Sequence, residues 1–227
     1  MSNRPVERTR AIVLRRTNFG EADRILRMIT PLGQRSVIAK GARREKSKLA
    51  GGIELFGISD VVIQHGKGDL AMLTSARLVQ FYRHILEDYD RLQFGYEVIN
   101  AVAKASDHID EPEWYGVLSE VFMALDVPAI PLLLVQSWFY LHYAELTGYE
   151  LNLDRDVAGQ ALDSRKTYMY DVNEKGLRLA EQGDIDANHI KLLRIIAQRS
   201  IQVVIQVGGI DALLPDIWLV ARQHAAV

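Results

Sequence analysis

The segment that decides the fold runs from Ala22 to Lys40 and reads ADRILRMITPLGQRSVIAK. Two apolar runs rich in β-branched residues flank Pro31-Leu32-Gly33-Gln34, and a proline and a glycine this close together are typical of a turn. The segment therefore predicts two strands, residues 22–30 and 35–40, joined by a short connection.

Three further strand-like runs lie on either side of this pair, at residues 10–16, 55–64 and 70–74. The last two are separated by His65-Gly66-Lys67-Gly68-Asp69, which predicts a hairpin turn. About five short strands at this spacing, with glycine-rich turns, are typical of a small closed barrel. The basic character of the module favours an OB-fold, which binds single strands on one face. Another small barrel or sheet with a structural role is the alternative.

Beyond residue 80 the apolar residues recur with the period of a helix, so the expected fold class is α+β. The division that follows is an OB-fold domain at residues 1–80 and an α-helical domain at 81–227. The predicted helices cover residues 90–106, 132–147, 186–207 and 211–223. A further helix is expected to start within residues 110–113, to present Trp114 to Leu125 and to be broken by Pro128. Residues 149–184 lose the helical period, and Tyr168 to Gly176 predicts a small hairpin within this irregular region.

The overall composition is that of an ordinary globular protein. The chain has 227 residues, of which 48% are hydrophobic and 25% charged, and it contains no cysteine. Its first residues lack the apolar core of a signal peptide, and no uncharged apolar run reaches the roughly 18 residues of a membrane helix. We therefore expect a soluble, cytoplasmic protein with no membrane partner.

Charge is distributed unevenly along the chain. Residues 1–80 hold 15 Lys and Arg against 7 Asp and Glu, a net charge of +8, whereas residues 81–227 hold 12 against 22, a net charge of −10. Such asymmetry indicates two roles, one of which faces an anion.

The strongest concentration of positive charge lies between Lys40 and Lys48, where nine residues hold five cations and one acid. A strand-like run precedes this block and Gly51-Gly52 follows it, which predicts a mobile loop at the end of a strand. Lysine and arginine displace the counterions that condense on a phosphate backbone, so the block predicts nucleic-acid binding.

The candidate DNA-binding residues are the cations on or beside the predicted strands: Arg15, Arg16, Arg24, Arg27, Arg35, Lys40, Arg43, Arg44, Lys46 and Lys48. Strand alternation places Arg24 and Arg27 on opposite faces, so only some of the ten are expected to touch nucleic acid. The candidate stacking aromatics are Phe19, Phe56, Phe81 and Tyr82, although each of them fits a core position better.

The sequence gives little support to catalysis. It has neither a G-x-x-x-x-G-K-[ST] phosphate loop nor a G-x-G-x-x-G dinucleotide turn. Its six histidines are scattered, with no metal-ligand spacing among them. We expect a protein that is not an enzyme and that has no catalytic residues, no cofactor and no metal site.

The N-terminal segment resembles the RecO family of bacterial recombination mediators. The resemblance lies in Ala11–Arg15, Gly20–Leu26, Ala39–Arg44, Ser47–Gly51, Leu55-Phe56 and Gly66–Leu70. It is carried by the order and spacing of these pieces, is strong over residues 9–82, fair over the helices to Asp154, and poor beyond.

The resemblance implies an N-terminal OB-fold, a helical body and a cofactor-free activity. Members of this family bind single- and double-stranded DNA and anneal complementary strands. With the partner RecR they help to load RecA onto DNA coated by single-strand DNA-binding protein.

The chain departs from the family pattern in two places. Many members hold zinc with two C-x-x-C pairs, which would fall here at Asp156 and Gly159 and near Leu179 and Gln182; none of the four is a cysteine. The region at 149–184 is thus expected to be zinc-less and held by packing, through Tyr168 and Tyr170. The C-terminal segment Ile210–Pro215 also lacks the basic, serine-containing character of the family.

Two other functions fit the same pattern. An RNA-binding OB-fold module would show the same groove and charge. A protein-interaction scaffold whose basic loop docks an acidic peptide would also explain the block of cations.

Overall fold

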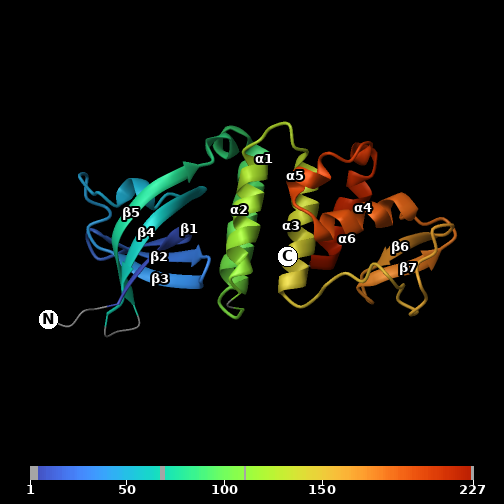
Figure 1. Cartoon of the computed structure of the whole chain (residues 1–227), viewed down its shortest axis with the longest axis horizontal. Helices are drawn as coiled ribbons and strands as arrows, with labels where there is room; N and C mark the ends of the chain where they lie inside the picture. Colours follow the sequence, from blue (N-terminus) through green and yellow to red (C-terminus); the bar gives the residue numbers. More distant parts are fainter. Residues whose placement is uncertain (1–4, 67–69, 110, 226–227) are drawn as a thin grey trace. The chain divides into compact units, whose positions relative to one another are not determined.

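The computed structural model describes residues 5–66, 70–109 and 111–225, which form two compact units, Met1–Asp126 and Val127–Val227 (Figure 1). The barrel strands end at Phe81, close to the domain boundary expected after residue 80. The first unit nevertheless continues through two helices, α1 (Tyr89–Ala105) and α2 (Glu113–Leu125).

Five strands of the first unit form a closed barrel in the order β1-β2-β3-β5-β4. They are β1 (Val6–Phe19), β2 (Asp23–Thr30), β3 (Gly33–Ala39), β4 (Gly57–Gln64) and β5 (Ala71–Phe81). Only β3 and β5 run parallel; the other neighbouring pairs are antiparallel. The predicted α+β class, with an N-terminal OB-fold barrel followed by helices, is confirmed.

Two strands are longer than the sequence predicted. The alternation of β1 is interrupted by a bulge between Val13 and Arg15, which hides the full length of the strand from a period-2 pattern. β5 continues past the predicted end at Thr74, and from Arg77 to Phe81 every residue is exposed, so no buried face marks this part. Of the predicted turn at 65–69, residues 67–69 lie outside the described part of the chain.

Inward-facing residues at alternate positions fill the barrel. The cluster includes Ala11, Val13, Leu26, Met28, Val37, Ala39, Val61, Ile63 and Leu73. Ile12 and Ile29 point outward and are still fully buried, because α2 contacts β1, β2 and β3, and α1 contacts β1. The two helices therefore cover one wall of the barrel.

The second unit contains α3 (Leu132–Leu146), α4 (Ala187–Gln198), α5 (Ile201–Val204), α6 (Leu214–Ala225) and the hairpin β6 (Thr167–Asp171) and β7 (Gly176–Ala180). The single helix predicted at 186–207 is wrong, because Arg199 and Ser200 are extended and separate α4 from α5. The helix predicted from 211 begins at Leu214, after a 3-10 turn at Ile210–Ala212. No helix in the described part of the chain is long and apolar enough to cross a membrane.

The hairpin is tied to the rest of the second unit by tyrosine and histidine side chains. Tyr168 is buried, and its hydroxyl accepts a hydrogen bond from the backbone N–H of Asp163 at 2.8 Å. Tyr170 and His224 of α6 are hydrogen-bonded, Oη to Nδ1, at 2.9 Å, and Nε2 of His224 lies 2.5 Å from the carbonyl of Tyr149. Burial lowers the pKa of His224, which favours the neutral ring that can accept at one nitrogen and donate at the other.

Candidate nucleic-acid interface

The basic loop, defined as residues Lys40–Lys48, is anchored to the barrel at both ends. Ala42 belongs to the barrel core, as does Ile53 just beyond the loop. The backbone N–H of Gly41 donates to Oδ1 of Asp23 at 2.7 Å, and that of Arg43 donates to the carbonyl of Ala22 at 2.9 Å. The start of the loop is therefore held beside the connection between β1 and β2, which the prediction of a mobile loop did not include.

Gly52 explains how the chain returns to the barrel after the loop. A Cβ at this position would lie 2.4 Å from the backbone of Ala76 in β5, closer than side chains are found to approach backbone. Only glycine allows this contact, so the glycine pair after the basic block sets a close approach to β5.

All five cations of the basic loop, Lys40, Arg43, Arg44, Lys46 and Lys48, are exposed. Arg43 donates to the carbonyl of Gly20 at 3.3 Å, which orients its guanidinium and leaves most of its donors free. Within residues 5–66, 70–109 and 111–225, none of the five forms an ion pair. The loop therefore presents charge that no internal carboxylate neutralises.

Three of the other predicted residues are engaged inside the protein. Arg16 pairs with Glu54 at 2.7 Å, and Arg27 pairs at 2.8 Å with Asp107, which lies just after the end of α1. Arg35 pairs with Glu7 at 3.1 Å. Each of the three would have to break or share a charge-assisted hydrogen bond to bind a phosphate.

Arg15 and Arg24 complete the predicted set. Arg15 is exposed on β1, where it is paired in the ladder with Arg27 and lines a groove beside α1 together with Arg27 and Asp107. Arg24 is half-buried, and its Nε is buried with no hydrogen-bond partner in the described part of the chain. Of the ten predicted cations, the structure thus places the five loop cations and Arg24 at one end of the barrel, which we call the basic end, and Arg15 beside the wall that α1 covers.

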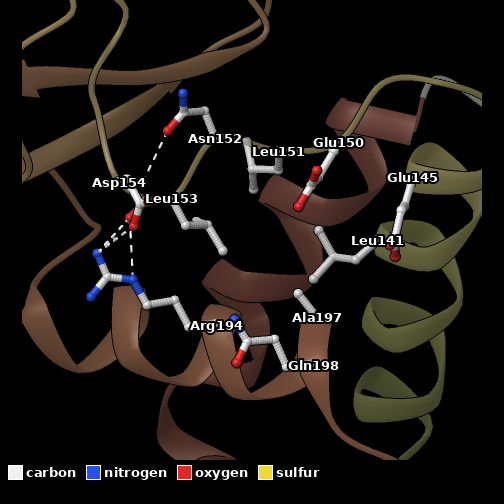
Figure 2. Close-up of a pocket in the computed structure, with 10 residues that line it drawn as sticks. All are labelled: Leu141, Glu145, Glu150, Leu151, Asn152, Leu153, Asp154, Arg194, Ala197 and Gln198. Atoms are coloured by element: carbon white, nitrogen blue, oxygen red, sulfur yellow. Dashed lines mark hydrogen bonds and ion pairs between the residues drawn. The ribbon is translucent and has the colours of Figure 1, made fainter.

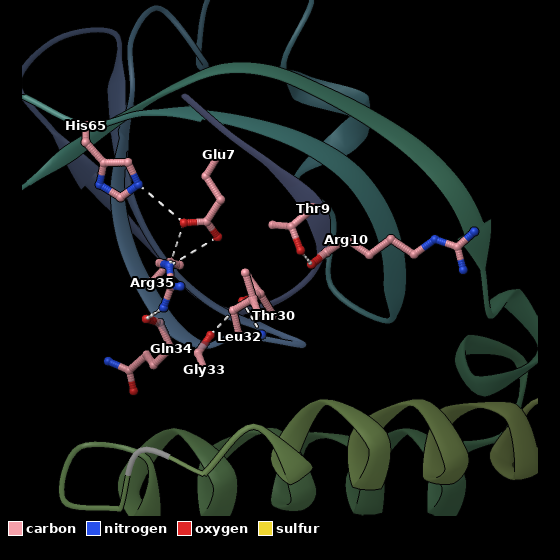
Figure 3. Close-up of polar contacts among 9 residues, drawn as sticks. All are labelled: Glu7, Thr9, Arg10, Thr30, Leu32, Gly33, Gln34, Arg35 and His65. Atoms are coloured by element: carbon pink, nitrogen blue, oxygen red, sulfur yellow. Dashed lines mark hydrogen bonds and ion pairs between the residues drawn. The ribbon is translucent and has the colours of Figure 1, made fainter. Parts of the chain in front are cut away.

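The opposite end of the barrel, which we call the neutralised end, has its cations matched by a carboxylate. Figure 3 shows Glu7 between Arg35 and His65, with Nε2 of His65 at 3.3 Å from the carboxylate. The nearby turn between β2 and β3 is closed by Thr30, whose hydroxyl donates to the carbonyl of Gly33 and accepts from the N–H of Leu32. Among the residues that the structure describes here, none offers free positive charge comparable to the basic loop.

The four candidate aromatics separate clearly by exposure. Phe56 and Tyr82 are buried and pack edge-on against Phe122, so they are core residues. Phe19 is 51% exposed at the last position of β1, next to the glycine that Arg43 contacts. Phe81 is partly exposed at the end of β5. Of the four aromatic residues, Phe19 is therefore the one with an exposed ring at the basic end.

The structure also shows a cationic cluster that the sequence did not predict. Arg8, Arg10 and Arg77 lie around Asp60 in a groove of about 460 Å³ on the outer surface of β1, β4 and β5. Burial raises the pKa of Tyr115 in α2, and among the opposing effects is the charge of nearby Arg10. The cluster was missed because the first strand was predicted to start only at residue 10 and the fifth to stop at 74. The signal that could have revealed the cluster was the alternation of Arg8 and Arg10, which places both side chains on one face of a strand.

The second unit has a pocket of a different character. It has a volume of about 410 Å³ between the end of α3, residues 150–154 and α4, and its lining includes Glu145, Glu150 and Asp154 (Figure 2). Arg194 donates to the carbonyl of Leu153 at 2.6 Å and lies 3.6 Å from Asp154. Three carboxylates against one engaged arginine make this pocket unfavourable for a phosphate. No group of three or more potential metal ligands occurs in the described part of the chain.

Comparison with known proteins places these features in context. Residues 1–82 match the family model described as Recombination protein O N terminal. A protein named DNA repair protein RecO from Dehalococcoides mccartyi (strain ATCC BAA-2266 / KCTC 15142 / 195) is 30% identical over 226 residues, covering 96% of this chain and 88% of that protein. Proteins of the same name from Roseiflexus sp. (strain RS-1) and Rubrobacter xylanophilus are 31% and 32% identical; these matches cover 65% of this chain and 52% and 59% of the relatives.

Proposed function

Because the chain belongs to the RecO family, whose members act in DNA repair and recombination, we propose that it is a DNA-binding recombination mediator. The observation that carries the proposal is the basic loop: five exposed cations without an internal ion pair in the described structure, held in place beside Phe19. This surface fits the sugar–phosphate backbone, which carries a regular array of negative charge.

The proposed mechanism needs no catalytic group. Lysine and arginine of the loop replace counterions on the strand, and the exposed ring of Phe19 offers a face on which a base can stack. Neutralised strands repel each other less, so pairing of complementary strands accelerates. The action on DNA is therefore binding and annealing rather than a chemical reaction.

The partners in this proposal follow from the family. The protein binds single- and double-stranded DNA and acts with RecR to assist the loading of RecA onto DNA coated by single-strand DNA-binding protein. The net charge of −10 on residues 81–227 supports the proposal that the barrel binds DNA and the remainder of the chain binds protein partners. An acidic surface repels DNA and so is a poor DNA-binding site.

The test is the binding of a fluorescent single-stranded oligonucleotide at several salt concentrations. If about 4–6 phosphates are neutralised, a plot of log K against log salt should have a slope of roughly −3 to −4. A flat plot would overturn the electrostatic proposal. An RNA oligonucleotide of the same sequence that binds more tightly than DNA would favour an RNA-binding module, and tighter binding of a free acidic peptide would favour a protein-interaction scaffold.

A further inference from the structure

The cluster of Arg8, Arg10 and Arg77, which we call the wall cluster, is built on one rung of the barrel. Arg10 of β1 is paired in the ladder with Asp60 of β4, which is paired in turn with Arg77 of β5. Asp60 accepts a hydrogen bond from Arg77 at 2.7 Å and lies 3.7 Å from Nε of Arg10. The carboxylate of Asp60 therefore lies between two guanidinium groups on the two strands that flank β4.

One carboxylate cannot neutralise this cluster. Arg8 is exposed two rungs along on the same face of β1, on the rung that it shares with Val62 and Ser75. Three arginines against one aspartate leave a net charge of +2. The side chains of Arg10 and Arg77 are 61% and 78% exposed, so most of their donors face solvent. A guanidinium has five N–H donors in a planar fork that suits phosphate oxygens.

The wall cluster is separate from the basic end. Arg10 and Phe19 are nine residues apart on β1, which corresponds to up to about 30 Å of strand. The wall cluster lies on the outer surface of β4 and β5, whereas the start of the basic loop is fixed to the connection between β1 and β2. After the loop the chain returns to β5 at Gly52, which lies against buried Ala76, while the neighbouring Ser75 and Arg77 are exposed. The barrel thus presents two groups of exposed cations that are built on different segments of the chain.

We propose that the wall cluster is a second phosphate-binding site, which holds the backbone of a second nucleic-acid strand while the basic loop holds the first. The inference rests on the proposed function and adds a division of that function between two surfaces. Holding two strands on one barrel raises the concentration of each strand near the other, which accelerates pairing beyond the effect of neutralisation alone. Ser75 adds a hydroxyl donor to the groove.

The experiment compares two readouts in the full-length protein: binding of a single-stranded oligonucleotide of about ten nucleotides, and the rate of annealing of two complementary strands. The test variant is Arg8→Gln/Arg10→Gln/Arg77→Gln. The control variant, Arg83→Gln/Lys166→Gln/Lys191→Gln, removes the same charge at exposed positions outside both surfaces. We expect the test variant to bind the short oligonucleotide within about two-fold of wild type and to anneal about ten-fold more slowly, while the control does neither.

The outcomes separate this inference from the proposed function. Annealing at the wild-type rate by the folded test variant would overturn the second site. A loss of short-oligonucleotide binding equal to the loss of annealing would also overturn it, because the wall cluster would then belong to a single strand path. If wild type itself does not bind the oligonucleotide with a steep salt dependence, the proposed function fails instead.

A second variant protects the test against misfolding. Ser75→Asp removes no arginine and places a negative charge in the groove at an exposed position. We expect the same selective loss of annealing, since the added carboxylate repels a phosphate. Normal annealing by this variant, checked to be folded by circular dichroism, would count against the second site even if the triple variant were unstable.

Discussion

The two ends of the barrel contain similar residues and differ in how those residues are paired. At the neutralised end, Arg35 and His65 both face the carboxylate of Glu7. At the basic end, the loop cations have no ion-pair partner within the described residues, and their backbone is fixed by Asp23 and Ala22. The comparison teaches that counting cations is not enough to choose a candidate phosphate site. We propose the basic end because its cations have no ion-pair partner among the described residues, whereas Arg35 and His65 already share Glu7.

Burial adds to this difference. The side chains of Arg35 and Glu7 are only 24% and 15% exposed, and both occupy inward-facing positions of their strands, so a phosphate would have to displace Glu7 from a half-buried pair. Breaking such a charge-assisted contact costs about 1.5–3 kcal/mol. The loop cations give up only water and counterions, and their release favours binding.

The most direct test of the difference between the two ends is to remove the charge of the basic end. In Arg43→Ala/Arg44→Ala/Lys46→Ala/Lys48→Ala we expect single-strand affinity near 0.15 M salt to fall about 10- to 100-fold. The salt slope should shrink by about 0.7 for each phosphate contact that is lost. Annealing should slow in parallel. Because these side chains are exposed, the melting temperature should stay within a few degrees of wild type.

A matched control removes four exposed cations elsewhere, Arg83, Arg165, Lys166 and Lys191. It should retain wild-type affinity if position matters and should lose affinity equally if only net charge matters. A folded loop variant that binds and anneals like wild type would show that Lys40–Lys48 is not the DNA contact.

Removal of the Phe19 ring also tests the basic end, with a smaller expected effect on single-strand affinity. Phe19→Ala should weaken single-strand binding by about 5- to 20-fold, because a half-exposed ring should contribute about 1–1.8 kcal/mol, the lower part of the range of about 1–3 kcal/mol for stacking one base on an aromatic ring. Phe19→Leu keeps an apolar side chain and removes the flat ring, so it should lose nearly as much affinity. Fluorescence anisotropy with an oligonucleotide measures both variants. If Leu restores wild-type binding, Phe19 provides apolar surface and not a stacking platform.

Local patterns were sufficient to predict the barrel and the basic loop. Alternation in residues 22–40 placed Leu26 and Arg27 on opposite faces, and the structure has Leu26 in the barrel core and Arg27 bonded to Asp107 outside it. The internal partners of the cations were not predictable, because Arg27 meets a carboxylate 80 residues away and Arg16 one 38 residues away. Such pairs depend on how the strands close and where α1 packs. The break between α4 and α5 was missed because neither Arg199 nor Ser200 is a strong helix breaker.

The smallest expected effect on DNA binding tests the neutralised end itself. Glu7→Gln leaves Arg35 and His65 without their carboxylate. We expect the free energy of unfolding to fall by about 1–3 kcal/mol, because a half-buried guanidinium loses its charged partner. Single-strand affinity should change by less than about two-fold, since the released charge still faces into the barrel mouth and is largely shielded from a strand. The double variant Glu7→Gln/Arg35→Gln should recover part of the lost stability, because it removes the unpaired charge.

If Glu7→Gln instead steepens the salt slope by about 0.7, the released cation has gained a phosphate contact. Pairing alone, and not the fixed exposure of the basic loop, would then distinguish the two ends of the barrel.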